Sequence, residues 1–369
     1  MTRPGIPRIG ILQRVLPAYR AALFDLLADA YGGNVSVFAG QGRKAEMIVP
    51  SIPQRAQYYP ARNHHFFNGS FYVCWQSGLL DWLQNWDPDV LIVEANPRYL
   101  RTPEALRWMR SRNRKVIGWG LGAPVITHDV LGIRYGLRTR FVRQFDAIIT
   151  YSTQGAREYQ SLAVDPSHIF IAPNAATSRP SEPIPERPDA YRGGKPVVVF
   201  VGRLQERKRV DVLIEACAAL SVEVQPLLWV IGDGPDRSAL EQLAQDLYPL
   251  ASFYGALHGK DLGQRLAMAD LFVLPGTGGL AVQEAMSYGL PVIVGEADGT
   301  QSDLVREENG WLLTQPSARA LADLMVDALA DIPSLREKGR AGYRIVSEEI
   351  NLEEMVSVFS GAISAVLDG

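Results

Sequence analysis

Residues 197–234, VVVFVGRLQERKRVDVLIEACAALSVEVQPLLWVIGDG, decide the fold class. The stretch begins with an apolar run that ends in glycine and continues with apolar residues at helical spacing. It closes with a second apolar run that ends in Gly-Asp-Gly. A strand, a helix and a strand in this order are typical of a parallel sheet with helices packed on its faces.

The same alternation continues on both sides, from RIGILQ near the beginning of the chain to ARALADLMVDALA near its end. It predicts an α/β protein built from doubly wound, Rossmann-like sheets. Residues 178–196 interrupt the alternation, and their proline and charge content predicts a linker. We therefore expect one domain at 1–177, the linker at 178–196, a second domain at 197–350, and a final helix at 351–369 that packs back on the first domain.

The length of the chain agrees with two domains, because single cores stop growing at about 250 to 300 residues. Its composition, 47% hydrophobic and 21% charged, is that of a globular protein. The sequence shows neither an apolar run of about 18 residues nor a signal peptide, which predicts a cytoplasmic protein. Cys74 and Cys217 lack metal-ligand spacing and are expected to be ordinary core thiols.

The small net charge of −3 conceals an asymmetry between the two halves. Residues 1–180 hold 21 Lys and Arg against 12 Asp and Glu, whereas residues 181–369 hold 16 against 28. The positive excess gathers at residues 98–115 and 134–143, on predicted helices. Two interpretations stand: solvated helix faces, or a surface for an anionic acceptor and for peripheral association with an anionic membrane. No nucleic-acid partner is indicated.

A loop with two cations follows the first strand of the opening stretch. Gly202 permits a tight turn, and Arg203 and Lys208 follow in the loop GRLQERKR. Two cations on one strand-end loop can neutralise a diphosphate leaving group in the ground state and in the transition state. Cations on loops are more often simply solvated, and this alternative stays open.

A glycine-rich segment, PGTGGLAVQEA at residues 275–285, leads into another predicted helix. Gly278, Gly279 and Leu280 lie where free N–H groups and the helix dipole favour a phosphate. Glu284 follows among apolar neighbours, where a carboxylate without hydrogen bonds is costly. Two vicinal ribose hydroxyls would satisfy it, so we predict Glu284 to bind a nucleotide ribose unless donors of the protein do so.

Together, these motifs resemble the retaining nucleotide-sugar glycosyltransferases of family GT4, which have the GT-B fold of two Rossmann-like domains facing each other across a cleft. The resemblance is carried by FVGRLQERKRVDVLIEA, WVIGDGP, FYGAL, LAMADLFVLPGTGGLAVQEAMSYGLPVIV and NGWLL, in the family's order and spacing. In the first half, LPAYR, WGLG and IITYS…IAPNA are similar to a bacterial polysaccharide-assembly subgroup. The resemblance implies sugar transfer from a nucleotide-diphosphate sugar to a hydroxyl of a glycan, a lipid-linked saccharide or a small molecule.

Carried over by position, the resemblance assigns a role to each candidate residue. Arg203 and Lys208 become the diphosphate clamp, and Glu284 becomes the ribose ligand. Arg14 follows the first strand and is either a third phosphate donor or a surface charge. The remaining candidates are Gly202 at the clamp, Gly278, Gly279 and Leu280 beside the phosphates or the donor sugar, Tyr254 and Leu257 beside the base, and Gln13 beside Arg14.

Two positions depart from the family pattern. Where many members have a glutamate eight residues before the ribose ligand, this chain has Gly276, as does the subgroup with Pro-Gly-x-Gly-Gly-Leu. Where many members have a histidine after the strand VIGWG, this chain has Leu121. His128 is the nearest replacement and is either a catalytic contact to the sugars or a structural residue.

The sequence also bears on the mechanism. It shows no Asp-x-Asp motif, so we expect metal-independent transfer with no cofactor besides the donor, in which cations and a helix N-terminus stabilise the diphosphate. Retention of configuration is implied by the resemblance alone. The alternatives are a nucleotide-sugar 2-epimerase of the same fold and a nucleotide-sugar-binding protein without catalysis.

Overall fold

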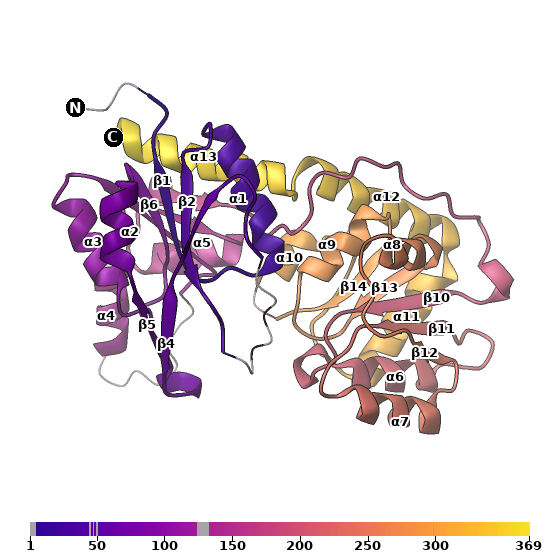
Figure 1. The fold of residues 1–369 in the computed structure, drawn as a ribbon. Helices are drawn as coiled ribbons and strands as arrows, with labels where there is room; N and C mark the ends of the chain where they lie inside the picture. Colours follow the sequence, from indigo (N-terminus) through magenta and orange to yellow (C-terminus); the bar gives the residue numbers. More distant parts are fainter. Residues whose placement is uncertain (1–4, 44–45, 47, 49–50, 124–132, 298) are drawn as a thin grey trace. The chain divides into compact units, whose positions relative to one another are not determined.

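The computed structural model describes residues 5–43, 46, 48, 51–123, 133–297 and 299–369 (Figure 1). The chain divides into two compact units. The first consists of Met1–Ala176 together with Leu352–Gly369, and the second is Thr177–Asn351. The last segment of the chain therefore belongs to the same unit as the first.

The first unit is built on a seven-stranded parallel sheet in the order β3-β2-β1-β6-β7-β8-β9. β1 lies between β2 and β6, and its Ile9 is in register with Val35 of β2 and with Val90 of β6. The strands are β1 (Ile9–Val15), β2 (Val35–Gly40), β3 (Gln57–Pro60), β6 (Val90–Glu94), β7 (Lys115–Gly120), β8 (Ala147–Thr150) and β9 (Ile169–Ile171).

Alternate residues of these strands bury opposite faces of the sheet, because side chains of a strand point to its two faces in turn. Ile9 and Ile11 pack in a core with α1 and α13, whereas Leu12 packs in a second core with α2 and α3. Both faces are thus covered, as a parallel sheet requires. The helices are α1 (Ala18–Ala30), α2 (Leu79–Trp86), α3 (Thr102–Arg110), α4 (Ile133–Val142), α5 (Thr153–Ser161) and α13 (Leu352–Asp368).

A hairpin of β4 (Arg62–Phe66) and β5 (Val73–Ser77) forms a separate two-stranded antiparallel sheet in the first unit. Its strands are joined across the short 3₁₀ turn η2 (Gly69–Phe71). A backbone bridge between Cys74 and Tyr99 connects the hairpin to the chain that follows β6. The sequence pattern did not predict this hairpin.

The second unit repeats the design with a six-stranded parallel sheet in the order β12-β11-β10-β13-β14-β15. The strands are β10 (Val197–Val201), β11 (Leu227–Ile231), β12 (Ala251–Phe253), β13 (Leu271–Leu274), β14 (Val292–Gly295) and β15 (Gly310–Leu313). The helices are α6 (Val210–Ala219), α7 (Arg237–Leu247), α8 (Gly259–Met268), α9 (Leu280–Ser287), α10 (Gln301–Leu304), α11 (Ala318–Ala330) and α12 (Ile332–Glu348). The predicted α/β class of two doubly wound sheets is confirmed.

The segment at 178–196, which the sequence predicts as a linker, is fastened to the second unit. Arg187 donates hydrogen bonds to the carbonyl oxygens of Ala269 at 2.8 Å and Leu266 at 2.9 Å. Burial, with a smaller contribution from Arg336, lowers the pKa of Arg187 to about 10. Its proline-rich composition did not reveal these contacts.

The helical run Ile332–Asp368 is, within the described residues, the one stretch long and apolar enough to cross a membrane, and half of its most apolar window is buried. This run was not predicted from the sequence. Apolar side chains of this run are buried in the protein, because Met355, Phe359 and Ile363 of α13 belong to the core that also contains residues of α1. Cys74 and Cys217 are free and buried, as expected of core thiols.

Candidate functional site

The order of strands locates a ligand site in the second unit. From β10 the chain proceeds to β11 and β12 on one side, whereas β13, β14 and β15 lie on the other. In open α/β sheets ligands bind beyond the carboxyl ends of the strands at this reversal. Residues 202–209 leave β10 there and residues 275–279 leave β13, so both predicted phosphate segments lie at the reversal.

The two segments contact each other directly. The Thr277 N–H donates to the Arg207 carbonyl oxygen at 2.9 Å, and Lys208 Nζ donates to the Thr277 carbonyl oxygen at 2.5 Å. The Arg207 guanidinium also donates to the Thr277 hydroxyl at 3.1 Å. Lys208 is therefore held over the glycine-rich turn, and Arg203 lies half-buried earlier in the same loop.

Glycines make this approach possible. A Cβ on Gly276 would overlap the Arg207 carbonyl oxygen, and a Cβ on Gly278 would lie 2.5 Å from Lys208 Nζ. A glutamate at position 276 would therefore require the 207–208 backbone to shift. The structure gives a physical reason for the glycine that departs from the family pattern.

The Gly-Asp-Gly turn after β11 is explained by packing of the backbone. The Gly202 N–H donates to the Ile231 carbonyl oxygen at 3.0 Å, and the Leu204 N–H donates to that of Asp233 at 2.9 Å. A Cβ on Gly232 would overlap the Gly202 carbonyl oxygen. This turn thus supports the loop that carries Gly202, Arg203 and Lys208.

The residues assigned to the base follow β12 and are half-buried against the core of the second unit. Tyr254 meets the Trp229 ring edge-on at 5.9 Å between centroids, and the Arg265 guanidinium lies 4.0 Å from the centre of the Tyr254 ring. Leu257 also packs against this core. These contacts fix Tyr254 and Leu257 at the same edge of the sheet as the β10 loop.

Helix α9 begins at Leu280, directly after the glycine-rich turn, and Gly279 caps it without a side-chain hydrogen bond. Glu284 lies half-buried in the second turn of the helix. Within the part of the chain that the structure describes, no protein donor reaches the Glu284 carboxylate. Burial raises the pKa of Glu284, and the charge of His258 opposes this only in part.

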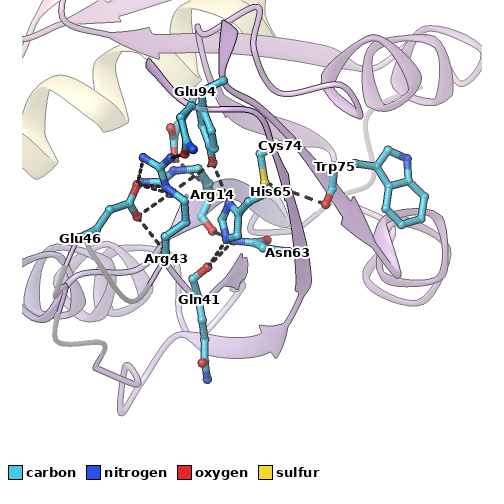
Figure 2. A network of polar contacts seen from close by, with 11 residues as sticks. Arg14, Gln41, Arg43, Glu46, Asn63, His65, Cys74, Trp75 and Glu94 are labelled. Carbon is cyan, nitrogen blue, oxygen red and sulfur yellow. Dashed lines mark hydrogen bonds and ion pairs between the residues drawn. The ribbon is translucent and has the colours of Figure 1, made fainter. Parts of the chain in front are cut away.

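The first unit has a corresponding strand-order reversal between β1 and β6, and Arg14 lies there (Figure 2). The Arg14 N–H donates to Glu94 at 2.7 Å, and its guanidinium donates to Glu46 at 2.9 Å. Arg43 also binds Glu46, at 3.1 Å. Arg14 is therefore neither a simple surface charge nor an uncommitted phosphate donor, because its side chain is 15% exposed and ion-paired.

Electrostatics agree with this network of Arg14, Arg43, Glu46 and Glu94. Burial alone would raise the pKa of Glu46, but the hydrogen bonds from Arg14 and Arg43 outweigh it and hold that pKa below its usual value. For Glu94 burial dominates and raises the pKa, although Arg14 donates to it. The sequence placed Arg14 at a strand end but gave no signal for Glu46.

Of the two further candidates in the first unit, the structure describes Gln13 but not His128. Gln13 is buried, its carbonyl oxygen accepts from Gln76 at 3.1 Å, and its amide nitrogen has no partner within the described residues. His128 lies in the stretch 124–132, outside the described residues. Leu121, at the position where many family members have histidine, is exposed after β7.

The basic segments carry charges that are partly matched within the protein. At 98–115, Arg101 pairs with Glu104 and Arg114 pairs with Asp87, while Arg107 is exposed. In the described ranges no group of three or more His, Cys, Asp or Glu side chains is arranged to hold a metal ion.

Comparisons with known proteins agree on the class of fold. The structure matches HepE of Anabaena in complex with UDP at a TM-score of 0.69 and 17% identity, covering 97% of this chain and 100% of that one. It matches sucrose-phosphate synthase from Thermosynechococcus elongatus at a TM-score of 0.74 and 18% identity, covering 98% and 99%. The fold is thus the GT-B fold of glycosyltransferases.

Residues 186–344 match the family model described as glycosyl transferases group 1. A GDP-mannose-dependent alpha-mannosyltransferase of Mycobacterium tuberculosis (strain CDC 1551 / Oshkosh) is 42% identical over 32% of this chain and 30% of its own length. A GDP-mannose-dependent alpha-(1-6)-phosphatidylinositol monomannoside mannosyltransferase of the same strain is 28% identical over 68% of this chain and 67% of its own length. The chain spans less than a third of the first of these relatives. The match to the family model lies within the second unit.

Proposed function

We propose that the protein is a hexosyltransferase that moves a sugar from a nucleotide-diphosphate sugar to an acceptor hydroxyl with retention of configuration. The observation that carries the proposal is at the β10–β13 reversal. There a lysine is held over a glycine-rich turn, and α9, which follows that turn, carries a carboxylate that no donor from the described residues reaches. A diphosphate would pair with the lysine and the N-terminus of α9, and the hydroxyls of a ribose would donate to the carboxylate.

In the proposed reaction, the bond from the anomeric carbon to the diphosphate breaks as the acceptor oxygen bonds to the same face of that carbon. The departing diphosphate accepts the proton of the acceptor hydroxyl. Lys208 and Arg203 stabilise the negative charge that develops on the leaving oxygen. Glu284 holds the ribose, and Tyr254 and Leu257 border the base.

The donor comes first among the experiments. Relatives named as GDP-mannose-dependent make GDP-mannose the first donor to test, and the UDP complex of a structural neighbour makes UDP-glucose the second. We expect one of them to raise the melting temperature and to be consumed with transfer to an added acceptor. Formation of an epimer instead would indicate the epimerase, and binding without turnover would indicate a binding protein.

We further propose that the acceptor is anionic or lipid-linked and that the protein works in the cytoplasm at the inner face of the membrane. The support is the positive excess of residues 1–180 and the exposed Arg107 on α3. Cations near an anionic surface gain about 1 kcal/mol each, and salt screens this gain. Release from anionic vesicles with rising salt tests the proposal, and equal partition onto neutral vesicles would contradict it.

A further inference from the structure

The β4–β5 hairpin is an addition to the doubly wound sheet. It pairs with no strand of the seven-stranded sheet. It is attached through Cys74, which pairs with His65 close to the tip and whose N–H donates to the Arg98 carbonyl oxygen at 3.0 Å. In Figure 1 the hairpin extends away from α13 and ends at η2. Because the sheet has its helices on both faces without the hairpin, folding does not explain what its tip displays.

Three phenylalanine side chains at the tip of the hairpin are exposed to solvent. Phe66, Phe67 and Phe71 are 46%, 73% and 77% exposed. Aromatic rings of this size normally dominate cores and interfaces, so three exposed ones within six residues are unusual on a water-facing turn. Phe67 also has a φ of +60°, in the left-handed region where bulky residues are strained. Neither burial nor backbone preference accounts for phenylalanine at this position.

The sequence on either side of the tip holds no carboxylate. From residue 47 to residue 80 it contains no Asp or Glu, but it contains Arg55, which pairs with Asp29, and Arg62. Arg43 reaches the tip as well, where its guanidinium donates to Asn68 Oδ1 at 3.0 Å. Glu46, the nearest carboxylate in sequence, is bound by two arginines. An apolar tip without a carboxylate of its own, and with Arg43 beside it, complements a surface that is apolar inside and anionic at its rim.

We propose that Phe66, Phe67 and Phe71 insert into the interface of a bilayer that carries anionic lipid headgroups, with Arg43 and Arg62 at headgroup level. Aromatic rings favour that interface, and a cation beside them adds attraction to anionic lipid. The inference deepens the proposed peripheral association by naming the element that inserts. It is independent of sugar transfer, because none of the three phenylalanines is assigned to the donor site.

The test compares two surface variants on vesicles of phosphatidylcholine with and without phosphatidylglycerol. The first is the triple variant F66S/F67S/F71S. The second is the control V222S/L247S, which removes two apolar side chains that are 71% and 48% exposed on the second unit. Burying one phenylalanine side chain in the bilayer raises the partition coefficient onto vesicles roughly tenfold or more. The triple variant should therefore bind anionic vesicles about a hundredfold or more weakly than the wild type. The control should bind like the wild type.

Three outcomes would overturn the proposal: a wild type that does not bind anionic vesicles, a triple variant that binds like the wild type, or a control that loses binding equally. A second measurement locates the insertion. Phe71→Trp should be quenched by brominated lipid in anionic vesicles, and an unquenched tryptophan would also contradict insertion. Donor-induced melting shifts and transfer to a water-soluble acceptor should be unchanged in the triple variant, so failure of the insertion remains distinguishable from failure of the transferase proposal.

Discussion

The two strand-order reversals occupy equivalent places in similar sheets, yet they treat charge in opposite ways. At β1 and β6 of the first unit, Arg14 is engaged by Glu46 and Glu94. At β10 and β13 of the second unit, Lys208 donates to the Thr277 carbonyl oxygen at 2.5 Å, and Glu284 has no protein donor among the described residues. The strand order therefore determines where a ligand can bind, and the loop residues determine whether the charged side chains there are already paired within the protein.

The largest effect that this comparison predicts is on the rate of transfer, when Lys208 or Arg203 is removed. Lys208→Ala and Arg203→Ala should each reduce the rate of transfer about a hundredfold or more, the size expected when a preorganised donor to a developing charge is removed. Arg209→Gln serves as the control on the same loop, because Arg209 pairs with Asp211 near the surface. Steady-state kinetics of the three variants measure the difference. Near-normal turnover of both the Lys208 and Arg203 variants would remove the clamp.

The next largest predicted effect is on donor affinity, when Glu284 is changed. Glu284→Gln keeps the shape but loses charge-assisted hydrogen bonds to the ribose, so donor affinity should weaken by about 1.5 to 3 kcal/mol. The melting temperature of the free protein should be retained, because a neutral amide is less costly to bury than a carboxylate. Calorimetry on one variant yields both quantities. A destabilised protein with normal nucleotide affinity would show that Glu284 is structural.

The same residue predicts a pH dependence. Burial raises the pKa of Glu284 in the free protein above its ordinary value of 4.5, and hydroxyl donors of a ribose favour the charged form. The complex therefore has the lower pKa, and donor affinity should fall as the pH drops through the raised pKa. Comparing wild type with Glu284→Gln removes the contribution of the nucleotide's own phosphates. Identical pH profiles would contradict ribose binding by Glu284.

A smaller effect, on stability rather than on binding, is predicted for the first unit. Glu46→Gln should lower the free energy of unfolding by about 1.5 kcal/mol, the low end for hydrogen bonds to charged groups. Because the folded protein holds the pKa of Glu46 below 4.5, the stabilisation is full above that pH and is lost as the pH falls through the depressed pKa. Donor affinity should not change. Denaturant titrations at neutral and acid pH check the stability, and weaker donor binding would place Glu46 near the donor instead.

The smallest effect concerns metal. We expect EDTA to leave transfer unchanged, because cations of the β10 loop and the N-terminus of α9 can stabilise the diphosphate. The rate with and without chelator measures it directly. Loss in EDTA that Mg²⁺ or Mn²⁺ restores would reveal a site that the carboxylates of this chain were not expected to form.

The fold could be predicted because it rests on local patterns. Apolar runs such as 197–201 alternate with amphipathic segments, and this alternation has one common solution, the doubly wound parallel sheet. The β4–β5 hairpin was missed because NHHFF and YVCWQ do not alternate polar and apolar residues cleanly. The attachment of 178–196 was missed because it depends on Arg187 meeting carbonyl oxygens about 80 to 100 residues further along the chain.

The candidate site could be predicted as far as strand ends and glycines reveal it. Gly202 and Lys208 follow β10, and Glu284 lies in the second turn of α9, so their places follow from the topology. The contact between Lys208 and Thr277 joins two loops far apart in the sequence, which no pattern indicates. Arg14 lies near the end of β1 as expected, whereas its pairing with Glu46 joins residues 32 positions apart in the sequence, which no pattern indicates.

Helix α13 has a consequence for the order in which the protein takes shape during synthesis. The core of the first unit needs Phe359, whose ring meets that of Trp119 edge-on at 4.9 Å, yet Phe359 is translated after the whole second unit. Domains generally fold as units while the chain emerges. The second unit can therefore complete its core first, and the earlier-made first unit keeps an open apolar face until the last helix leaves the ribosome.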